Sequence, residues 1–152
     1  MSERAVYWDP KKIISSLLGS WSLSRSIDNG TSMAGTATFS DGGNRRYPYV
    51  EHGTLQLADG QIVNAERRYI FEEAESGFAV LFAETPPRLF HRIALTREGA
   101  NWVGDAVHLC NEDRYESRYE FRPDASFTVR HAVRGPRKQY VIRTRYTRSP
   151  LA

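Results

Sequence analysis

Hydrophobic and polar residues alternate along most of the chain. In residues 20–27 a serine occupies every even position, whereas Trp21, Leu23, Arg25 and Ile27 share the other face. Alternation of this kind indicates a strand with one solvent-facing side and one buried side. By the same pattern we expect further strands at residues 32–40, 45–51, 53–58, 61–72, 77–83, 88–96, 100–110, 113–122, 126–133 and 138–147.

Turn residues separate these segments, and Asp59-Gly60 is a typical two-residue hairpin turn. No crossover helices lie between the strands, which excludes parallel βαβ units. The pattern predicts an all-β fold: one domain over residues 1–152, with residues 20–147 forming a closed antiparallel meander barrel of about ten strands. A barrel is favoured over a sandwich because the inward faces carry more polar groups than a dry sandwich core would tolerate.

One segment, residues 9–18, has the period of a helix. Asp9 can cap its N-terminus and Pro10 suits the first helical position. The apolar stripe of this helix consists of Ile13, Ile14, Leu17 and Leu18. A short helix with such a stripe needs an apolar partner, so we expect it to plug one open end of the barrel.

Composition narrows the possible partners and compartment. Lys and Arg together number 21 against 18 Asp and Glu, and a net charge of +3 is too small to indicate nucleic acid binding. The single cysteine, Cys110, cannot form an intrachain disulfide. Met1–Arg4 lacks the apolar run of a signal peptide, and no stretch is long enough to span a membrane. We therefore expect a cytoplasmic protein that binds a small molecule, with no cofactor, no nucleic acid and no membrane.

The start of the first strand, Gly19-Ser20-Trp21, resembles the G-x-W signature of the calycins. That superfamily includes lipocalins, fatty-acid-binding proteins and nitrobindins. In lipocalins the tryptophan seals the barrel floor, and a basic residue from the last strand packs across it. The resemblance implies this role for Trp21, with Arg143 or Arg145 as the basic residue.

A second resemblance covers nearly the whole chain. It is carried by Pro87-Arg88-Leu89-Phe90-His91, by His108-Leu109-Cys110 with Asp113 and Tyr115, and by Gly135-Pro136-Arg137-Lys138. These runs resemble the uncharacterised family called domain of unknown function 6314, whose members have a similar length and often stand alone. The resemblance supports the fold and implies no particular chemistry.

Strand alternation also places polar side chains inside the barrel. The candidates for a ligand site are Arg25, Arg67, Tyr69, His91, His108, Tyr115, Tyr119 and His131. A buried guanidinium must be paired. The two arginines are therefore either neutralised, by Glu51, Asp105 or Asp113, or available to anchor an anionic ligand. The Arg67-x-Tyr69 pair is chemically similar to the carboxylate-binding Arg-x-Tyr of fatty-acid-binding proteins, although it lies on a different strand.

The inward histidines allow several interpretations. His91, which we place inward together with Leu89 and Ile93, could join His108 and His131 in a zinc site with an open fourth position. We favour neutral rings hydrogen-bonded to tyrosine, aspartate or backbone. One ring could instead ligate haem, by analogy with nitrobindin.

Cys110 shares a face with His108 at a spacing of two residues. A neighbouring pair of this kind can generate a thiolate nucleophile. A lone cysteine is more often a small apolar residue that fills space in a core.

Three functions remain open from the sequence. The first is a non-catalytic protein that binds a small anionic or amphipathic molecule in the barrel. The second is an enzyme that uses His91, His108, His131 and Tyr115 as acid–base groups on a carbonyl or enol substrate. The third is a structural or interaction barrel whose polar interior is a closed hydrogen-bonded network. On the first hypothesis, Arg67, Tyr69, His91, His108, Tyr115 and His131 converge on one cavity.

Overall fold

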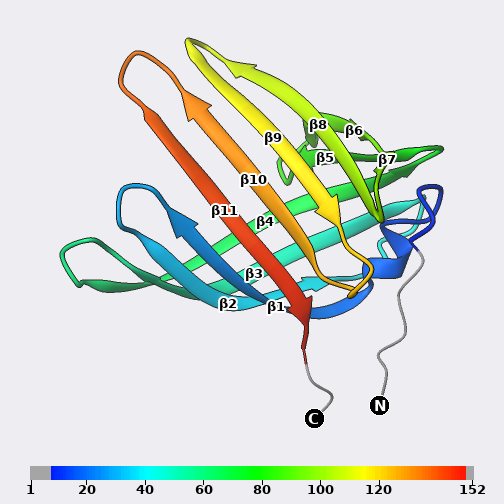
Figure 1. The fold of residues 1–152 in the computed structure, drawn as a ribbon, viewed down its shortest axis with the longest axis horizontal. Coiled ribbons are helices and arrows are strands. Elements are labelled where there is room, and N and C mark those ends of the chain that lie inside the picture. Colours follow the sequence, from blue (N-terminus) through cyan, green and yellow to red (C-terminus); the bar gives the residue numbers. More distant parts are fainter. Residues whose placement is uncertain (1–7, 150–152) are drawn as a thin grey trace.

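The computed structural model describes residues 8–149, which form one antiparallel sheet of eleven strands (Figure 1). The strands are β1 (Gly19–Ile27), β2 (Ser32–Phe39), β3 (Arg46–Gln56), β4 (Ile62–Ala74), β5 (Gly77–Phe82), β6 (Arg88–Ala94), β7 (Thr96–Glu98), β8 (Asn101–Cys110), β9 (Asp113–Phe121), β10 (Phe127–Arg134) and β11 (Gln139–Arg148). The predicted all-β meander barrel is confirmed. Met1–Arg4, on which the expectation about secretion depends, lies outside the described residues.

The sheet closes on itself through its first and last strands. β1 pairs with β2 on one side and with β11 on the other, so that the order runs β6-β5-β4-β3-β2-β1-β11-β10-β9-β8-β7. β6, at one end of this order, contacts β8, the strand next to the other end, without forming a backbone ladder. Gly104 of β8 makes the contact possible, since a Cβ there would lie 2.3 Å from Cγ2 of Ile93 in β6. The barrel is therefore nearly closed, with a side-chain seam in place of a final ladder.

Two expected strand boundaries were wrong. The two strands predicted at residues 45–51 and 53–58 are one strand, β3 (Arg46–Gln56), whereas the strand predicted at residues 88–96 is divided between β6 and the short β7. Gly53 is not a break in β3, because the neighbouring strand β2 approaches it closely. A Cβ at this position would lie 2.4 Å from the carbonyl oxygen of Ala34, so glycine is needed for close pairing.

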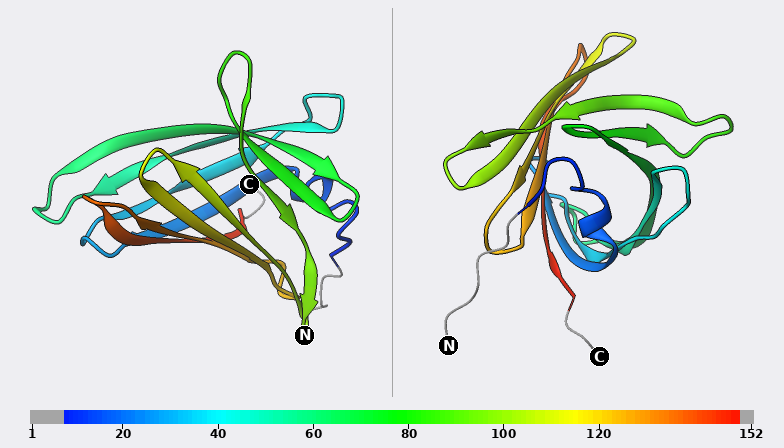
Figure 2. Two further views of the ribbon diagram at one scale, coloured as in Figure 1. Left: turned by 90° about the horizontal axis from the view of Figure 1, so that it is seen from above. Right: turned by 90° about the vertical axis from the view of Figure 1, so that its right-hand side faces the viewer.

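The N-terminal segment fills one end of the barrel but is not the α-helix expected for residues 9–18. It consists of turns followed by a 3₁₀-helix over Ser15–Leu17 (Figure 2). The hydroxyls of Ser15 and Ser16 donate to the carbonyls of Lys12 and Ile13, a local bonding pattern that competes with regular helix.

The apolar residues of this segment are only partly those of the expected stripe. Ile13, Ile14 and Leu17 are fully buried, as predicted for a plug. Leu18 is 38% exposed, because the chain leaves the 3₁₀-helix at this residue and becomes extended. The expectation that Leu18 faces the core was therefore wrong.

Trp21 is fully buried at the plugged end and donates its indole N–H to the carbonyl of Leu17 over 2.8 Å. The guanidinium of Arg148 lies 4.2 Å from its ring centroid and donates to the carbonyls of Ser16 and Leu18. A basic residue of the last strand thus covers the tryptophan, but it is neither Arg143 nor Arg145.

Strand register explains this correction. Arg148 lies directly opposite Trp21 and shares its inward face, whereas Arg143 and Arg145 lie opposite Ser26 and Ser24 on the outer face. The register of β1 against β11 depends on where the last strand ends, which alternation alone does not specify.

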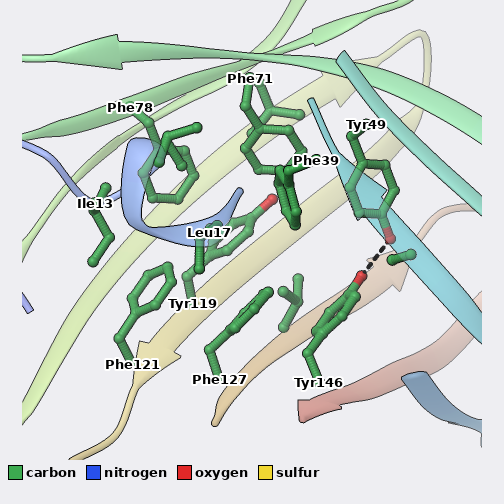
Figure 3. Close-up of a cluster of buried hydrophobic side chains, with 14 of the residues drawn as sticks. Ile13, Leu17, Phe39, Tyr49, Phe71, Phe78, Tyr119, Phe121, Phe127 and Tyr146 are labelled. Atoms are coloured by element: carbon green, nitrogen blue, oxygen red, sulfur yellow. Dashed lines mark hydrogen bonds between the residues drawn. The ribbon is translucent and has the colours of Figure 1, made fainter. Parts of the chain in front are cut away.

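Above Trp21 the barrel is filled by a cluster of aromatic rings (Figure 3). Phe127 stacks on Tyr146 with ring centroids 4.3 Å apart, and Trp21 meets Phe127 edge to face at 5.0 Å. Other phenylalanines of this cluster are Phe39, Phe71, Phe78, Phe90 and Phe121. These rings and the N-terminal plug close this end of the barrel, and several of them also line the inner cavity.

Candidate functional site

Two adjoining cavities occupy the barrel interior, and the inner one borders the aromatic cluster. The inner cavity, about 190 Å³, is lined by residues such as Arg25, Glu51, Tyr119 and Tyr146. The outer cavity, about 390 Å³, includes Phe82, Arg88, His108, Cys110 and Tyr115 in its lining. The residues that line both cavities are Arg67, Tyr69, Phe90, His131 and Ile142. These shared residues form the junction between the two cavities.

Arg25 is neutralised within the inner cavity. Its two terminal nitrogens bind the Glu51 carboxylate at 2.6 and 2.9 Å, and its Nε donates to Thr144 at 2.8 Å. Burial by itself raises the pKa of Glu51, but the contacts with Arg25 and with the Tyr49 hydroxyl lower it below its usual value. Glu51 was one of the three acids expected as a partner. Arg25 is therefore held as an ion pair and is not free for a ligand.

A chain of hydroxyls extends from Glu51 along the cavity wall. The Tyr49 hydroxyl donates to Glu51 over 2.7 Å and lies 2.7 Å from the Tyr146 hydroxyl, as the dashed line in Figure 3 marks. Since the Tyr49 proton is committed to Glu51, Tyr146 is the donor in the second bond. Burial raises the pKa of Tyr146 to about 12, so both phenols stay protonated at neutral pH.

Arg67 has a different environment. Its terminal nitrogen donates to the Tyr69 hydroxyl over 3.2 Å, and no carboxylate within residues 8–149 forms an ion pair with it. The other three arginines that line the two cavities are all paired: Arg25 with Glu51, Arg68 with Glu66, and Arg88 with Glu84. Arg67 is thus the lining guanidinium that forms no ion pair within the described residues. It is exposed to solvent, so the expectation that it is buried and must be paired was wrong. Its charge still lowers the pKa of Glu51, which lies opposite it in β3.

His131 lies on the same junction. Its Nδ1 atom is 2.7 Å from the Ser117 hydroxyl of the neighbouring strand, which is the side-chain hydrogen bond that His131 forms within residues 8–149. Burial lowers the pKa of His131 to about 4, and the positive charges of Arg25 and Arg67 act in the same direction. The ring is therefore neutral at neutral pH.

A β-bulge places Phe90 at the junction. Val80 pairs with His91 and Leu81 with Leu89, which leaves Phe90 as an extra residue in β6. As a result Phe90 is 7% exposed and Leu89 is 39% exposed, so the prediction that Leu89 faces inward was wrong. His91 and Ile93, beyond the bulge, are buried as expected.

His91 packs against Phe90, with ring centroids 4.0 Å apart, and its Nε2 atom bonds to the Tyr119 hydroxyl over 2.8 Å. Burial lowers the pKa of His91 to about 3, so this ring is neutral. Its Nδ1 atom is buried and has no hydrogen-bond partner within residues 8–149. His91 supports the site through Tyr119 and Phe90 and does not line either cavity.

The remaining candidates lie at the outer cavity. His108 and Tyr115 are paired across β8 and β9, and their rings are 6.3 Å apart. Cys110 is exposed, and its thiol is free. His91, His108 and His131 are not arranged as metal ligands, since no three His, Cys, Asp or Glu side chains within residues 8–149 are grouped closely enough.

The structure thus brings together most of the predicted residues. Arg67, Tyr69, His108, Tyr115 and His131 line the outer cavity, and Arg25 and Tyr119 line the inner one.

Sequence reasoning missed Tyr49 and Phe90. Tyr49 shares its face with Glu51 two residues away, and extending the alternation of β3 would have found it. Phe90 depends on a bulge for which the sequence carries no signal that we recognise.

Comparisons with known proteins bear on family and architecture. The model of a family of unknown function, DUF6314, matches residues 17–148. The chain belongs to this family. The match confirms the resemblance based on the Pro87–His91, His108–Cys110 and Gly135–Lys138 runs.

Three solved structures are similar to this DUF6314 member over most of its length. EF1p2_mFAP2b bound to DFHBI is 12% identical with a TM-score of 0.48, covering 93% of this chain and 100% of that one. A fluorescence-activating β-barrel designed de novo is 14% identical with a TM-score of 0.47, covering 90% and 96%. The redesigned β-barrel mFAP1, bound to DFHBI, is 11% identical with a TM-score of 0.45, covering 92% and 100%.

No curated protein matches the DUF6314 chain significantly. Within residues 8–149, no helix has the length and apolar character needed to cross a membrane.

Proposed function

We propose that this protein binds a small anionic or amphipathic molecule, with the anionic group at Arg67 and the apolar part among the aromatic side chains of the two cavities. The observation that carries the proposal is that Arg67, at the junction between them, forms no ion pair within the described residues. A guanidinium presents several donors in a fixed fork, which suits a carboxylate, sulfonate or phosphate. The Tyr69 hydroxyl, already in contact with Arg67, lies beside the same position.

The surroundings of Arg67 suit a ligand with an apolar body. Phe82 and Phe90 stack with centroids 4.9 Å apart, and Tyr69 lies parallel to Phe90 at 6.2 Å. These rings form an aromatic wall beside the charged group. Sites for small molecules commonly combine such apolar walls with a few polar groups that orient the ligand.

The closed end supports a calycin-like comparison as part of this proposal. Trp21 seals the floor beneath the basic side chain of Arg148, which is the arrangement that the G-x-W resemblance implied. In such a barrel the floor is structural and ligands enter from the opposite end.

The proposal is tested with two fluorescent probes that differ in charge. Anilinonaphthalene sulfonate carries a sulfonate, and phenylnaphthylamine has a similar ring system without it. We expect Arg67→Leu to weaken binding of the sulfonate probe roughly tenfold to a hundredfold, since a hydrogen bond to a charged group contributes about 1.5–3 kcal/mol. Binding of the neutral probe should be nearly unchanged.

Arg92→Leu is the matched control, because Arg92 is exposed, lies outside both cavities and has no ion pair within residues 8–149. It removes the same unit of charge from the same β-barrel. Equal sulfonate affinities of wild type and Arg67→Leu, or equal losses in the two variants, would overturn the proposal.

A further inference from the structure

The junction between the cavities contains a cross-strand hydrogen bond that determines what kind of ligand group it accepts. Ser117 of β9 and His131 of β10 are directly opposed in register, and their side chains meet at 2.7 Å between Oγ and Nδ1. In a neutral imidazole one ring nitrogen donates and the other accepts. The direction of this bond therefore decides which nitrogen of His131 carries its proton.

The surroundings of Ser117 determine that direction. Its side chain is buried, with the residue 3% exposed, and within residues 8–149 its hydroxyl has no acceptor other than Nδ1 of His131. If Nδ1 were protonated, the serine hydroxyl proton would be buried without an acceptor. A buried unsatisfied donor of this kind disfavours that arrangement by roughly 5- to 150-fold.

We infer that Ser117 is a positioning residue that holds His131 in the tautomer protonated on Nε2, so that the ring presents an N–H donor to the ligand beside Arg67. This inference rests on the proposed function. It favours a ligand group that accepts hydrogen bonds, such as a carboxylate, sulfonate or phosphate, over an ammonium group, which can only donate.

The charged groups around the junction agree with a donor-only site. Glu51 and Glu66 are the acids among the lining residues, and both are already paired, with Arg25 and Arg68 respectively. No unpaired carboxylate from the described lining therefore competes for the donors of Arg67 and His131. Because burial and the neighbouring positive charges lower its pKa to about 4, His131 keeps a single ring proton at neutral pH.

The test is a long-range proton–nitrogen NMR spectrum of histidine-labelled protein at pH 7, without ligand. It distinguishes protonated from unprotonated ring nitrogens. We expect Nε2 of His131 to be protonated and Nδ1 to be unprotonated in the wild type. Ser117→Ala should move the ring toward a mixture of tautomers, Ser117→Thr should restore the wild-type pattern, and the exposed Ser24→Ala should leave it unchanged.

Binding provides the second readout. Ser117→Ala should weaken the sulfonate probe about threefold to tenfold, with little effect on phenylnaphthylamine, because a disordered tautomer loses part of one hydrogen bond. A wild-type His131 protonated on Nδ1 would overturn the inference and leave the Arg67 result standing. An Arg67→Leu variant with full affinity would overturn the proposed function even if the tautomer were as expected. The wild-type spectrum decides the tautomer even if Ser117→Ala does not fold.

Discussion

The residues Arg25 and Glu51 form a buried ion pair, so the stability of the barrel depends on keeping both charges in its interior. The side chain of Arg25 is 13% exposed and that of Glu51 is 3% exposed. Two charges at such depth are tolerated because they bind each other in a bidentate contact and because Thr144 and Tyr49 satisfy further hydrogen bonds. Removing one partner would leave the other buried and unpaired.

We therefore expect Glu51→Gln to lower the free energy of unfolding by about 3–5 kcal/mol, measured by urea denaturation. Glu72→Gln breaks the exposed contact with Arg46 and should change it by less than about 1 kcal/mol. A combined Arg25→Met and Glu51→Leu variant should recover most of the loss, since no unpaired charge remains. Similar losses in Glu51→Gln and Glu72→Gln would contradict this account.

Among the secondary-structure elements, the N-terminal plug packs on the barrel through a few buried side chains and not through the continuous apolar face of a regular helix. Leu17 is buried against the aromatic cluster, whereas Leu18, the next residue, is turned toward solvent. We expect Leu17→Ala to cost about 2–5 kcal/mol in the free energy of unfolding, as for other buried leucines. Leu18→Ala should cost well under half of that.

The free energies of unfolding of the two leucine variants are compared by thermal and urea denaturation. The comparison is sensitive to local structure because an amphipathic helix would bury both residues to similar extents. Equal destabilisation would show that the segment packs as the continuous helix that periodicity predicts.

The strands show where sequence reasoning succeeds and where it stops. Alternation correctly placed Tyr115, Tyr119 and His131 inside the barrel because β9 and β10 pair without interruption. It failed at Leu89 because one extra residue in β6 reverses the faces on either side of it. Two neighbouring strands can each be predicted correctly while the register between them remains undetermined. For this reason the sequence did not identify Arg148 of β11 as the residue opposite Trp21 of β1.

The sequence predicted most of the residues that line the candidate site, but not which of them form ion pairs with one another. The alternation of side chains along a strand places both Arg25 and Arg67 on inward faces. Their different roles depend on Glu51, which forms an ion pair with Arg25 and none with Arg67, although Arg67 lies opposite it in the neighbouring strand. Side-chain reach across a barrel is a three-dimensional property for which one sequence provides no direct signal.

The folded barrel as a whole buries two neutral histidine side chains, His91 and His131, which would be protonated in mild acid if the chain were unfolded. Burial lowers the pKa of His91 from its usual 6.5 to about 3. The unfolded chain therefore binds more protons than the folded one between these values. The stability contributed by a neutral His91 is fully present above about pH 6.5 and is lost as the pH falls toward 3.

Between pH 6.5 and 5, above the range in which most carboxylates titrate, His91 alone should lower the free energy of unfolding by about 1 to 2 kcal/mol. His131, whose pKa is lowered to about 4, should act in the same direction. We expect His91→Gln to flatten this pH dependence, as measured by urea unfolding at each pH. His52→Gln, at an exposed histidine, is the matched control for the substitution itself. A His91→Gln profile parallel to wild type would mean that this ring is already protonated in the folded protein.

The pairing of β1 with β11 has a consequence for how the protein is made. β1 is the first strand of the barrel to be synthesised, but one of its two ladder partners is the last. A nascent chain on the ribosome can form the hairpins from β1 to β6 and still expose an unpaired strand edge on β1. That edge is a template for wrong pairing with other chains until β11 emerges. Premature termination before β11 would therefore yield an aggregation-prone fragment, and chaperone dependence should be greatest late in the synthesis of the barrel.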